Sequence, residues 1–242
     1  MKMKRQLGCL LLVALMVAML AQMSTAKDAT TILKQHERNS ISLELEFSKR
    51  NQSPLQQVVS FLNLGPNGYA TGFLVGGRLV VTAYHVVSGD LDQSKKLALG
   101  FGRDDQLQAK VFFNGCQAKV LGVDKEADLA LLEVCGPSKQ NGTPAFQSSI
   151  TKDEKLFLIA RPHGDRIVGR GTFMGAYAFN GLEYWSVRIS ARDGFSGSPV
   201  YNEQGEVVGV FSGYDWARNL AVISPGARAQ KLIAAYSSTA KP

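Results

Sequence analysis

The segment of this chain best suited to chemistry is a serine within a glycine-rich turn, Asp193-Gly194-Phe195-Ser196-Gly197-Ser198-Pro199. Glycines allow a tight turn that presents the Ser196 hydroxyl. The backbone N–H groups of Gly194 and Ser196 can then converge on one point and form an oxyanion hole, which stabilises a carbonyl oxygen under attack. Taken alone, the segment also fits an ordinary β-turn, because Gly, Ser and Pro are frequent in turns.

A serine hydroxyl becomes a good nucleophile only when a base lies beside it, and a third group must orient that base. The chain contains His36, His85 and His163, all before Ser196. This order excludes the α/β-hydrolase arrangement, in which the histidine follows the serine. His85 follows a Gly-Gly turn and an apolar run, so a buried strand would hold it in place. His163 lies in a polar turn and His36 in a weakly structured arm. We therefore expect His85 to be the base, although a core histidine is the alternative.

The third group has two candidates, Asp128 and Asp124. Asp128 begins the apolar run Asp128-Leu129-Ala130-Leu131-Leu132, where a partly buried carboxylate could hold one imidazole tautomer and stabilise the imidazolium. Asp124 lies in the adjoining turn. We favour Asp128, and a simple turn acid is the alternative for either residue.

Short apolar runs broken by Gly, Asn and Asp position these residues, a pattern typical of all-β sandwiches and barrels. We expect strands at residues 58–64, 70–75, 78–82, 96–101, 106–113, 117–123 and 128–134, and then at 155–160, 171–178, 183–189, 199–201, 206–212 and 219–222. A helix is expected over residues 227–236, with Ser224 as its cap and Pro225 at its first position. The Gly/Pro/Ser-rich stretch at 136–149 separates the two sets of strands.

The N-terminal segment reads as a secretory signal peptide, residues 1–26, with three basic residues, an apolar run and small residues before the cleavage point. Its removal lowers the formal charge from +7 to +4. Residues 27–54 form an N-terminal arm or a propeptide. Within them the alternation from Ile41 to Phe47 favours a strand, and a flexible arm is the open alternative. An uncleaved membrane anchor is a minor alternative, because the apolar run of about 15 residues is shorter than a span of roughly 20.

Four ordered blocks resemble the signature segments of trypsin-like serine peptidases, in particular the bacterial HtrA-like and glutamyl-endopeptidase-like branch. The blocks are Ala70-Thr71-Gly72-Phe73, Thr82-Ala83-Tyr84-His85-Val86-Val87, Asp128-Leu129-Ala130-Leu131-Leu132 and Gly194-Phe195-Ser196-Gly197-Ser198-Pro199. The likeness covers roughly residues 58–236. The sequence departs from the family at Phe195, where Asn or Asp is usual, and at Tyr84, where Ala is usual. Both side chains flank the reacting residues.

The resemblance implies an all-β, chymotrypsin-like double barrel: two six-stranded antiparallel β-barrels with a C-terminal helix. The first barrel would span residues 55–137 and carry His85 and Asp128. An interbarrel linker would span 138–150, and the second barrel with the helix 151–237, carrying Ser196. We expect no cofactor and no metal, since the acidic residues and His85 lack a zinc-ligand spacing. With 46 residues after Ser196, we do not expect this sequence to include the PDZ domain of HtrA proteases.

Two cysteines, Cys116 and Cys135, remain after the signal peptide. They flank an expected hairpin with its turn at 124–127, and without a bulge they would face each other across the strands. Directly opposed side chains are close enough for a disulfide when the pair is not hydrogen-bonded. Export makes oxidation plausible. We expect a Cys116–Cys135 disulfide, with two small buried hydrophobes as the alternative.

The resemblance also identifies residues that would bind the substrate on the acyl side of the cut bond. Ser190 stands where trypsin-like enzymes with a cation pocket have an acid. Phe211 stands where glutamyl endopeptidases have a histidine. The segment Ser212-Gly213-Tyr214 would pair with the substrate backbone, and Tyr214 would narrow the pocket entrance. Ser212 also resembles the family serine that hydrogen-bonds the triad aspartate. A small or medium uncharged residue is therefore expected before the cut bond.

The expected function is that of a secreted or periplasmic serine endopeptidase that acts on peptide or protein substrates through His85, Asp128 and Ser196. The alternative is a catalytically silent double-barrel protein that binds peptides or partners. An esterase would differ only in the acyl group attacked. Nucleic-acid binding is not expected, because the charge is dispersed and no basic run with aromatics occurs. No stable membrane span is expected after signal cleavage.

Overall fold

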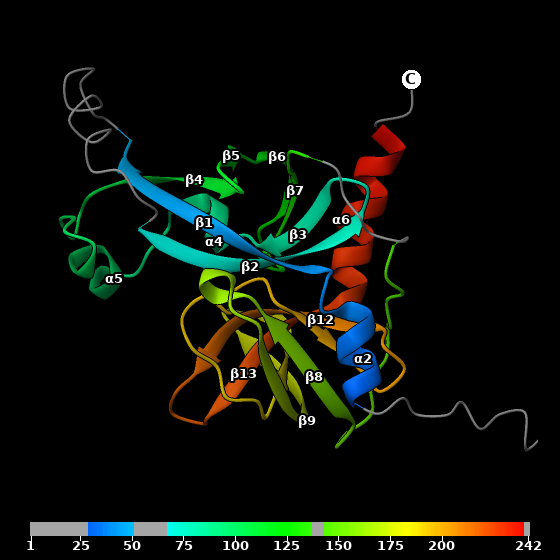
Figure 1. Cartoon of the computed structure of the whole chain (residues 1–242). Helices are drawn as coiled ribbons and strands as arrows, with labels where there is room; N and C mark the ends of the chain where they lie inside the picture. Colours follow the sequence, from blue (N-terminus) through cyan, green and yellow to red (C-terminus); the bar gives the residue numbers. More distant parts are fainter. Residues whose placement is uncertain (1–28, 51–66, 137–142, 240–242) are drawn as a thin grey trace, which may run out of the picture.

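The computed structural model describes residues 29–50, 67–136 and 143–239, and these form two β units (Figure 1). The first unit contains β1 (Ser40–Lys49), β2 (Gly68–Gly76), β3 (Leu79–Ala83), β4 (Leu107–Phe113), β5 (Cys116–Gln117), β6 (Lys119–Asp124) and β7 (Leu129–Glu133). The second contains β8 (Lys155–Ala160), β9 (Ile167–Phe179), β10 (Leu182–Val187), β11 (Pro199–Tyr201), β12 (Val207–Asp215) and β13 (Leu220–Pro225). The helical elements are α2 (Ala29–His36), α4 (His85–Ser88), α5 (Gln93–Ala98), the 3₁₀ turn η1 (Pro162–Gly164) and α6 (Gly226–Thr239).

The topology confirms an all-β fold with a C-terminal helix. The first unit is a sheet in the order β5-β4-β1-β2-β3-β7-β6, and the second is a closed barrel in the order β10-β13-β12-β11-β8-β9. All pairings between these strands are antiparallel. The first unit therefore has seven strands rather than the expected six. Within the described ranges, no helix is long and apolar enough to cross a membrane.

The extra strand is β1, which lies in the segment expected to be an arm or propeptide. Its alternating residues Ile41, Leu43, Leu45 and Phe47 are all at most 8% exposed, and β1 pairs with both β2 and β4. A period of two places these four side chains on one face, where they join the core of the sheet. The strand alternative is therefore correct, and the first unit begins at Ser40 rather than at residue 55.

Some sequence expectations fall outside the described residues, and others are wrong. The signal peptide at 1–26, the strand at 58–64 and residues 138–142 of the linker lie outside. The strand expected at 96–101 is wrong, because helix α5 occupies residues up to Ala98. The carboxylate of Asp92 accepts the Lys95 N–H at 2.8 Å and so caps a run of good helix formers.

The C-terminal helix also starts differently from the expectation. Ser224 and Pro225 end strand β13, where they pair with Val210 and Gly209, so α6 begins at Gly226 without a Ser224 cap. The helix runs along one side of both β units (Figure 1). Arg228 on α6 binds the carboxylate of Asp124 through two hydrogen bonds of 2.9 and 2.8 Å, which ties the helix to the first unit.

A shared core holds the two units in a fixed relation. Phe73 and Leu129 from the first unit pack in one buried cluster with Ile159, Tyr201 and Val210 from the barrel, and each is at most 1% exposed. Interiors are close-packed, so neither unit can rotate without opening this cluster. Residues from the two units can therefore meet in a defined geometry.

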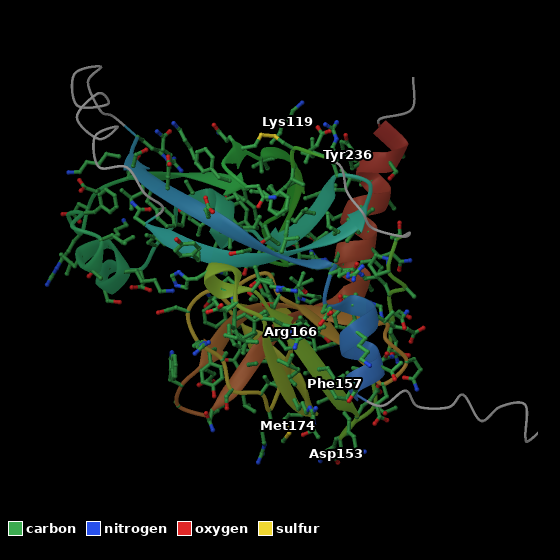
Figure 2. The ribbon with its side chains drawn as sticks, viewed as in Figure 1. Lys119, Asp153, Phe157, Arg166, Met174 and Tyr236 are labelled. Carbon is green, nitrogen blue, oxygen red and sulfur yellow. A yellow bond between two sulfur atoms is a disulfide. The ribbon has the colours of Figure 1, made fainter. Side chains whose placement is uncertain are left out.

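The expected disulfide between Cys116 and Cys135 is present, and Figure 2 shows its sulfur–sulfur bond beside Lys119. The expected register behind it is wrong. The β6–β7 ladder pairs Asp124 with Leu129, and it contains a bulge between Val120 and Gly122. Cys116 belongs to β5, which pairs with β4, and Cys135 follows β7. The bond therefore links the edge strand β5 to a position two residues after β7, and it does not bridge opposed positions in one hairpin.

Replacing both cysteines by alanine is expected to lower the free energy of unfolding by about 2–4 kcal/mol, because the bond restricts the unfolded chain. Urea unfolding of the oxidised protein and of the Cys116→Ala/Cys135→Ala variant measures this difference. The reduced wild-type protein is the matched control and should resemble the variant. Equal stability of all three forms would contradict the expected contribution.

Candidate active site

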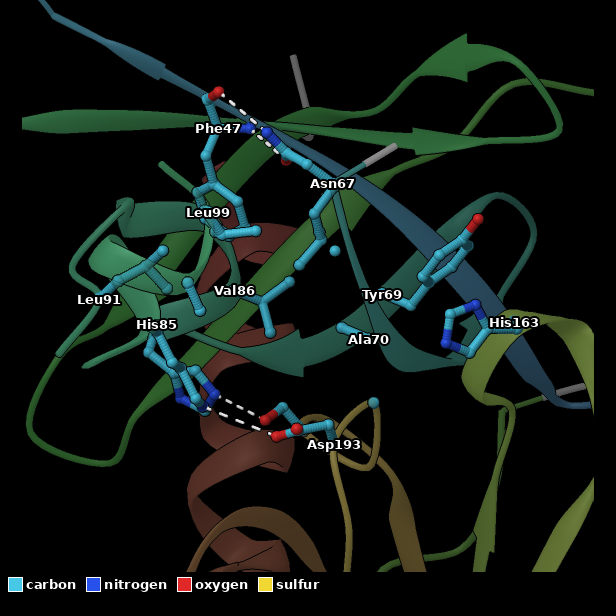
Figure 3. Close-up of a pocket in the computed structure, with 16 residues that line it drawn as sticks. Phe47, Asn67, Tyr69, Ala70, His85, Val86, Leu91, Leu99, His163 and Asp193 are labelled. Carbon is cyan, nitrogen blue, oxygen red and sulfur yellow. Dashed lines mark hydrogen bonds and ion pairs between the residues drawn. The ribbon is translucent and has the colours of Figure 1, made fainter. Parts of the chain in front are cut away.

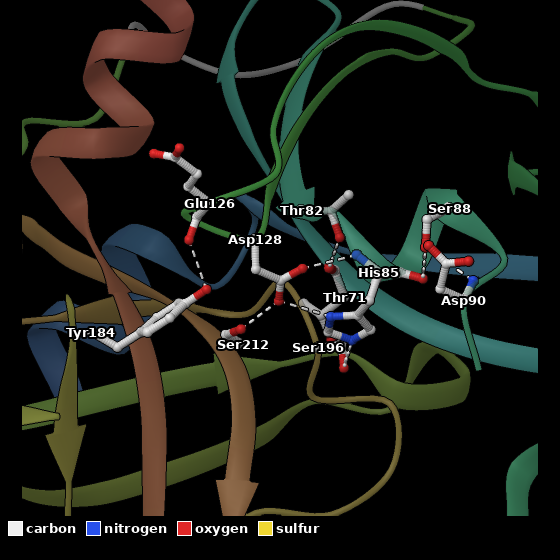
Figure 4. A network of polar contacts seen from close by, with 10 residues as sticks. All are labelled: Thr71, Thr82, His85, Ser88, Asp90, Glu126, Asp128, Tyr184, Ser196 and Ser212. Atoms are coloured by element: carbon white, nitrogen blue, oxygen red, sulfur yellow. Dashed lines mark hydrogen bonds and ion pairs between the residues drawn. The ribbon is translucent and has the colours of Figure 1, made fainter. Parts of the chain in front are cut away.

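The structure brings His85, Asp128 and Ser196 together from three separate turns (Figure 4). His85 begins α4, two residues after β3 ends, and Asp128 lies directly before β7, which pairs with β3. The Nδ1 atom of His85 lies 2.8 Å from Oδ2 of Asp128, and its Nε2 atom lies 2.7 Å from Oγ of Ser196. A carboxylate only accepts, so Nδ1 carries the proton and the Nε2 lone pair faces the serine hydroxyl.

The carboxylate of Asp128 is held from two further sides. Its Oδ1 accepts the backbone N–H of His85 at 2.9 Å, and its Oδ2 accepts the hydroxyl of Ser212. A register shift in β12 between Phe211 and Gly213 accounts for the direction of Ser212, because a bulge re-aims one side chain. The side chain of Asp128 is 14% exposed, against 35% for that of His85, so the acid is shielded while the imidazole stays accessible.

Tyr184 contributes to this network, and sequence reasoning missed it. Its hydroxyl donates to the carbonyl oxygen of Glu126 at 2.8 Å, two residues before Asp128 (Figure 4). Burial, and after it the negative charge of Asp128, raises the pKa of the Tyr184 hydroxyl, so it remains a donor. Tyr184 lies on β10, 58 positions from Glu126, and no local motif marks the pair.

The competing candidates have other partners. Asp124 accepts two hydrogen bonds from Arg228 and one from the Ala127 N–H, so its carboxylate is occupied. The His163 ring stacks on that of Tyr69 with ring centroids 3.8 Å apart. His36 is buried against another aromatic ring of the barrel. The structure places none of the three beside Ser196.

The turn around Ser196 needs glycine at two positions. Gly194 and Gly197 have φ angles of 87° and 83°, in the left-handed region that favours glycine. A Cβ atom on Gly197 would lie 2.2 Å from the Thr71 carbonyl oxygen, and one on Gly194 would lie 2.6 Å from Cβ of Pro162. The backbone of this turn can therefore approach both β units closely only because Gly194 and Gly197 lack side chains.

Two N–H groups in the segment from Gly194 to Ser198 have no acceptor within the part of the chain that the structure describes. They belong to Gly194 and Ser196, whereas the N–H groups of Phe195, Gly197 and Ser198 donate to backbone carbonyls at 2.8–3.2 Å. The first two are the pair expected to form an oxyanion hole. Their free state is what such a site requires before substrate binds.

Thr71 on β2 is a second residue whose role sequence reasoning missed. Its buried hydroxyl donates to the Gly194 carbonyl at 2.8 Å and accepts the Arg161 N–H at 2.9 Å. Its own N–H donates to the Ser196 carbonyl at 2.9 Å. Thr71 therefore fixes the serine turn of the barrel to the first unit. The block Ala70-Thr71-Gly72-Phe73 was noticed in the sequence, but nothing in it indicates this contact.

Phe195 stands where related sequences usually have Asn or Asp, and its side chain packs in the barrel core. Its side chain is 2% exposed and meets the Phe211 ring nearly edge-on, with centroids 6.2 Å apart. An edge-on aromatic pair of this kind is stabilising, so the contact holds the turn against the barrel core. Phe211 is itself 4% exposed, so its main contacts are with the barrel core, and its part in substrate binding remains a prediction.

The remaining acyl-side residues lie at a free strand edge. Gly213 and Tyr214 pair with Val222 and Ala221 of β13 on one side, while β11 covers the other side of β12 only as far as Val210. Such an unpaired edge can accept a peptide as an added strand. Ser190 is exposed and makes no hydrogen bond among the described residues.

Both acids near the acyl side already have a hydrogen-bond or ion-pair partner. Asp215 accepts the Arg218 N–H at 3.1 Å and the Tyr177 hydroxyl at 3.0 Å, and the Arg218 N–H foremost holds the pKa of Asp215 below its usual value. Asp193 is fully exposed and lies 4.0 Å from the Lys95 ammonium.

Among the described residues, no group of three or more His, Cys, Asp or Glu could hold a metal.

The sequence matches a known protein family. Over residues 70–210 the sequence matches the family described as the trypsin-like peptidase domain. Proteins of Brucella suis and Brucella abortus named "probable periplasmic serine endoprotease DegP-like" are 26% identical over 189 residues, covering 73% of this chain and 32% of theirs. The chain thus spans about a third of those relatives' length.

Solved structures resemble the fold. The active form of the Rv3671c protease from M. tuberculosis has a TM-score of 0.58 at 16% identity, covering 84% of this chain and 82% of that chain. An inactive form of the Rv3671c protease has a TM-score of 0.55 at 15% identity, covering 85% and 92%. At this identity the likeness concerns the fold, and it confirms the chymotrypsin-like fold class.

Proposed function

The chain belongs to the trypsin-like peptidase family, and from that premise we propose that it is an exported serine endopeptidase with Ser196, His85 and Asp128 as its triad. The apolar N-terminal segment supports export, as does the disulfide, since disulfides persist in oxidising compartments. A mature N terminus at Lys27 in protein recovered outside the cytoplasm tests the export step, and a retained residue 1–26 segment would contradict it.

The proposed mechanism follows from the hydrogen-bond chain. His85 Nε2 takes the proton as Ser196 Oγ attacks the scissile carbonyl carbon, and the N–H groups of Gly194 and Ser196 bind the oxyanion. Asp128 stabilises the imidazolium, which then gives its proton to the leaving amine. Water attacks the acyl-enzyme with His85 again as base, and the proton returns to Ser196 Oγ.

One observation carries this proposal: the bonds of 2.7 and 2.8 Å that join Ser196, His85 and Asp128 lie beside two N–H groups without acceptors in the described chain. A serine-reactive organophosphonate should therefore form one adduct, on Ser196, which mass spectrometry can locate. Absence of any adduct would favour the silent binding protein. An adduct with ester hydrolysis but no peptide cleavage would indicate an esterase.

We expect cleavage after small or medium uncharged residues such as Ala or Val. Ser190 offers no anion to a Lys or Arg side chain, and burying an unpaired cation is costly. Asp215 is already hydrogen-bonded by Arg218 and Tyr177. The Tyr214 ring packs against the Trp216 ring beside the strand edge, with ring centroids 4.6 Å apart. Digestion of a denatured protein mixture, followed by mass spectrometry of the new termini, measures the preference. A dominant Lys/Arg or Glu signature would overturn this interpretation.

Thr71→Val is expected to lower kcat by about tenfold with little change in KM, because Gly194 loses an anchor and the oxyanion donors lose some of their preorganisation. Thr71→Ser is the matched control, since it keeps the hydroxyl, and it should retain nearly full kcat. Steady-state kinetics measures kcat and KM. The affinity for a peptide aldehyde inhibitor, which mimics the tetrahedral state, should fall in parallel with kcat in the Val variant. Equal kcat values for the Val and Ser variants would show that the hydroxyl does not position Gly194.

A further inference from the structure

A cavity of about 470 Å³ opens beside Ser196 on the side of His85 (Figure 3). Its lining comes from β1, β2, α4, α5 and the residues next to them, together with η1 and the turn around Ser196. The apolar residues that line it are Leu45, Phe47, Ala70, Val86, Leu91, Ala98 and Leu99. None of the acyl-side residues at 190 or 211–214 lines it. Its volume lies within the range typical of ligand sites, about 300–1,000 Å³.

The chemistry decides which part of a substrate would reach this cavity. The leaving amine must come within hydrogen-bond distance of His85 Nε2 to receive its proton. His85, Gly194 and Ser196 all line the mouth of the cavity, whereas the acyl side of the substrate is expected at the free edge of β12. The residues that follow the cut bond therefore pass directly over the cavity.

The lining favours an apolar side chain. Leu45, Phe47 and Val86 are 5%, 8% and 2% exposed, so the wall they form is packed and fixed. The charged groups of the site stay at its mouth, where the side chains of Lys95 and Asp193 are 56% and 100% exposed. A charged side chain placed against this apolar wall would lose its hydration without gaining a partner from these three residues, whereas an apolar side chain would leave water.

We propose that this cavity is a leaving-group subsite that takes a bulky apolar side chain, of the size of Leu, Ile or Phe, from the first or second residue after the cut bond. The inference rests on the proposed serine-peptidase function. It adds a preference for the substrate residues that follow the cut bond, which the acyl-side residues do not contact.

Acyl transfer to added amines tests the subsite separately from catalysis. A peptide methyl ester with Ala or Val on the acyl side forms the acyl-enzyme and releases methanol, which is too small to fill the cavity. A dipeptide amide then attacks the acyl carbon, its proton passes to His85 Nε2, the ester bond to Ser196 Oγ breaks, and the proton moves to that oxygen. The ratio of transfer product to hydrolysis product measures how well each dipeptide amide binds.

Dipeptide amides with Leu or Phe at the first or second position should give transfer ratios at least about tenfold higher than Gly-Gly amide, since methylenes in an apolar pocket discriminate by tenfold or more. Amides with Asp or Lys at the same positions should resemble Gly-Gly amide. Ester turnover without any such selectivity at either position would overturn the inference. Failure of the ester to turn over would instead contradict the proposed function.

Two variants assign the preference to this cavity. Ala98→Glu adds a carboxylate to an exposed position of its wall, and it should remove the Leu and Phe preference while raising transfer to Lys-containing amides. The matched control is Leu97→Glu on the same helix, where the wild-type side chain is 49% exposed and does not line the cavity. Leu99→Ala should reduce the preference without adding charge. Unchanged selectivity in both Ala98→Glu and Leu99→Ala would overturn the assignment.

Discussion

Ser196→Ala should lower kcat for peptide hydrolysis by about 10⁶-fold, and His85→Ala should do the same, because nucleophile and base act as one unit. The two side chains share the single hydrogen bond of 2.7 Å through which the proton moves. The double variant should therefore lose no more than either single variant. Steady-state kinetics on one fluorogenic peptide, with active protein at high concentration, covers the required range.

The neighbouring Ser198 provides the matched control for this prediction. It lies two residues away in the same turn, is fully buried, and its hydroxyl has no hydrogen-bond partner in the described part of the chain. Ser198→Ala should therefore leave kcat almost unchanged. Ser196→Ala removes an atom without adding bulk, so its thermal melting should also match that of the wild-type protein. Substantial peptidase activity in a folded Ser196→Ala protein would refute the assignment of the nucleophile.

Asp128→Asn should lower kcat by about 10⁴-fold and leave the fold intact, a magnitude taken from other serine proteases. The amide of Asn would donate to His85 Nδ1 and so favour the tautomer that carries its proton on Nε2. That tautomer cannot accept the proton of Ser196. The amide oxygen of the introduced Asn side chain could still accept the His85 backbone N–H or the Ser212 hydroxyl, so the turn before β7 should remain ordered. Kinetics at saturating substrate, together with circular dichroism of the variant, tests both halves of this statement.

Asp124→Asn is the comparison that separates the two acids of this hairpin. Asp124 binds Arg228 on α6 rather than His85, so its replacement should weaken the attachment of the helix and change kcat little. Because Asp124 ends β6 and Asp128 directly precedes β7, a general disturbance of the connection between these strands would affect both variants alike. A larger loss of kcat for Asp124→Asn than for Asp128→Asn would contradict the proposed triad.

Several elements could be predicted from local patterns. Strands β8 and β11 occur at the expected bounds, because strongly apolar runs between turn residues leave few alternatives. The expectation at 96–101 was wrong because a capping Asp92 and helix-forming residues determine that segment more strongly than its apolar content. The cysteine pair was expected, but the register that suggested it was not observed, since Asp124 pairs with Leu129 rather than with Ala127, and a bulge in β6 then shifts the ladder by one residue. Bulges depend on packing with neighbouring strands, which a single sequence does not display.

The sequence by itself determined the residue types, their order along the chain and the turns that carry them, because glycine requirements and strand periodicity are local properties. It therefore identified His85, Asp128 and Ser196 as candidates. Only the tertiary structure decided how they are supported. Thr71 reaches Gly194 across 123 positions and Arg161 across 90, and the leaving-group cavity is walled by elements from distant parts of the chain. Such contacts arise when the shared core fixes the two β units against each other, and no local pattern encodes the distances between them.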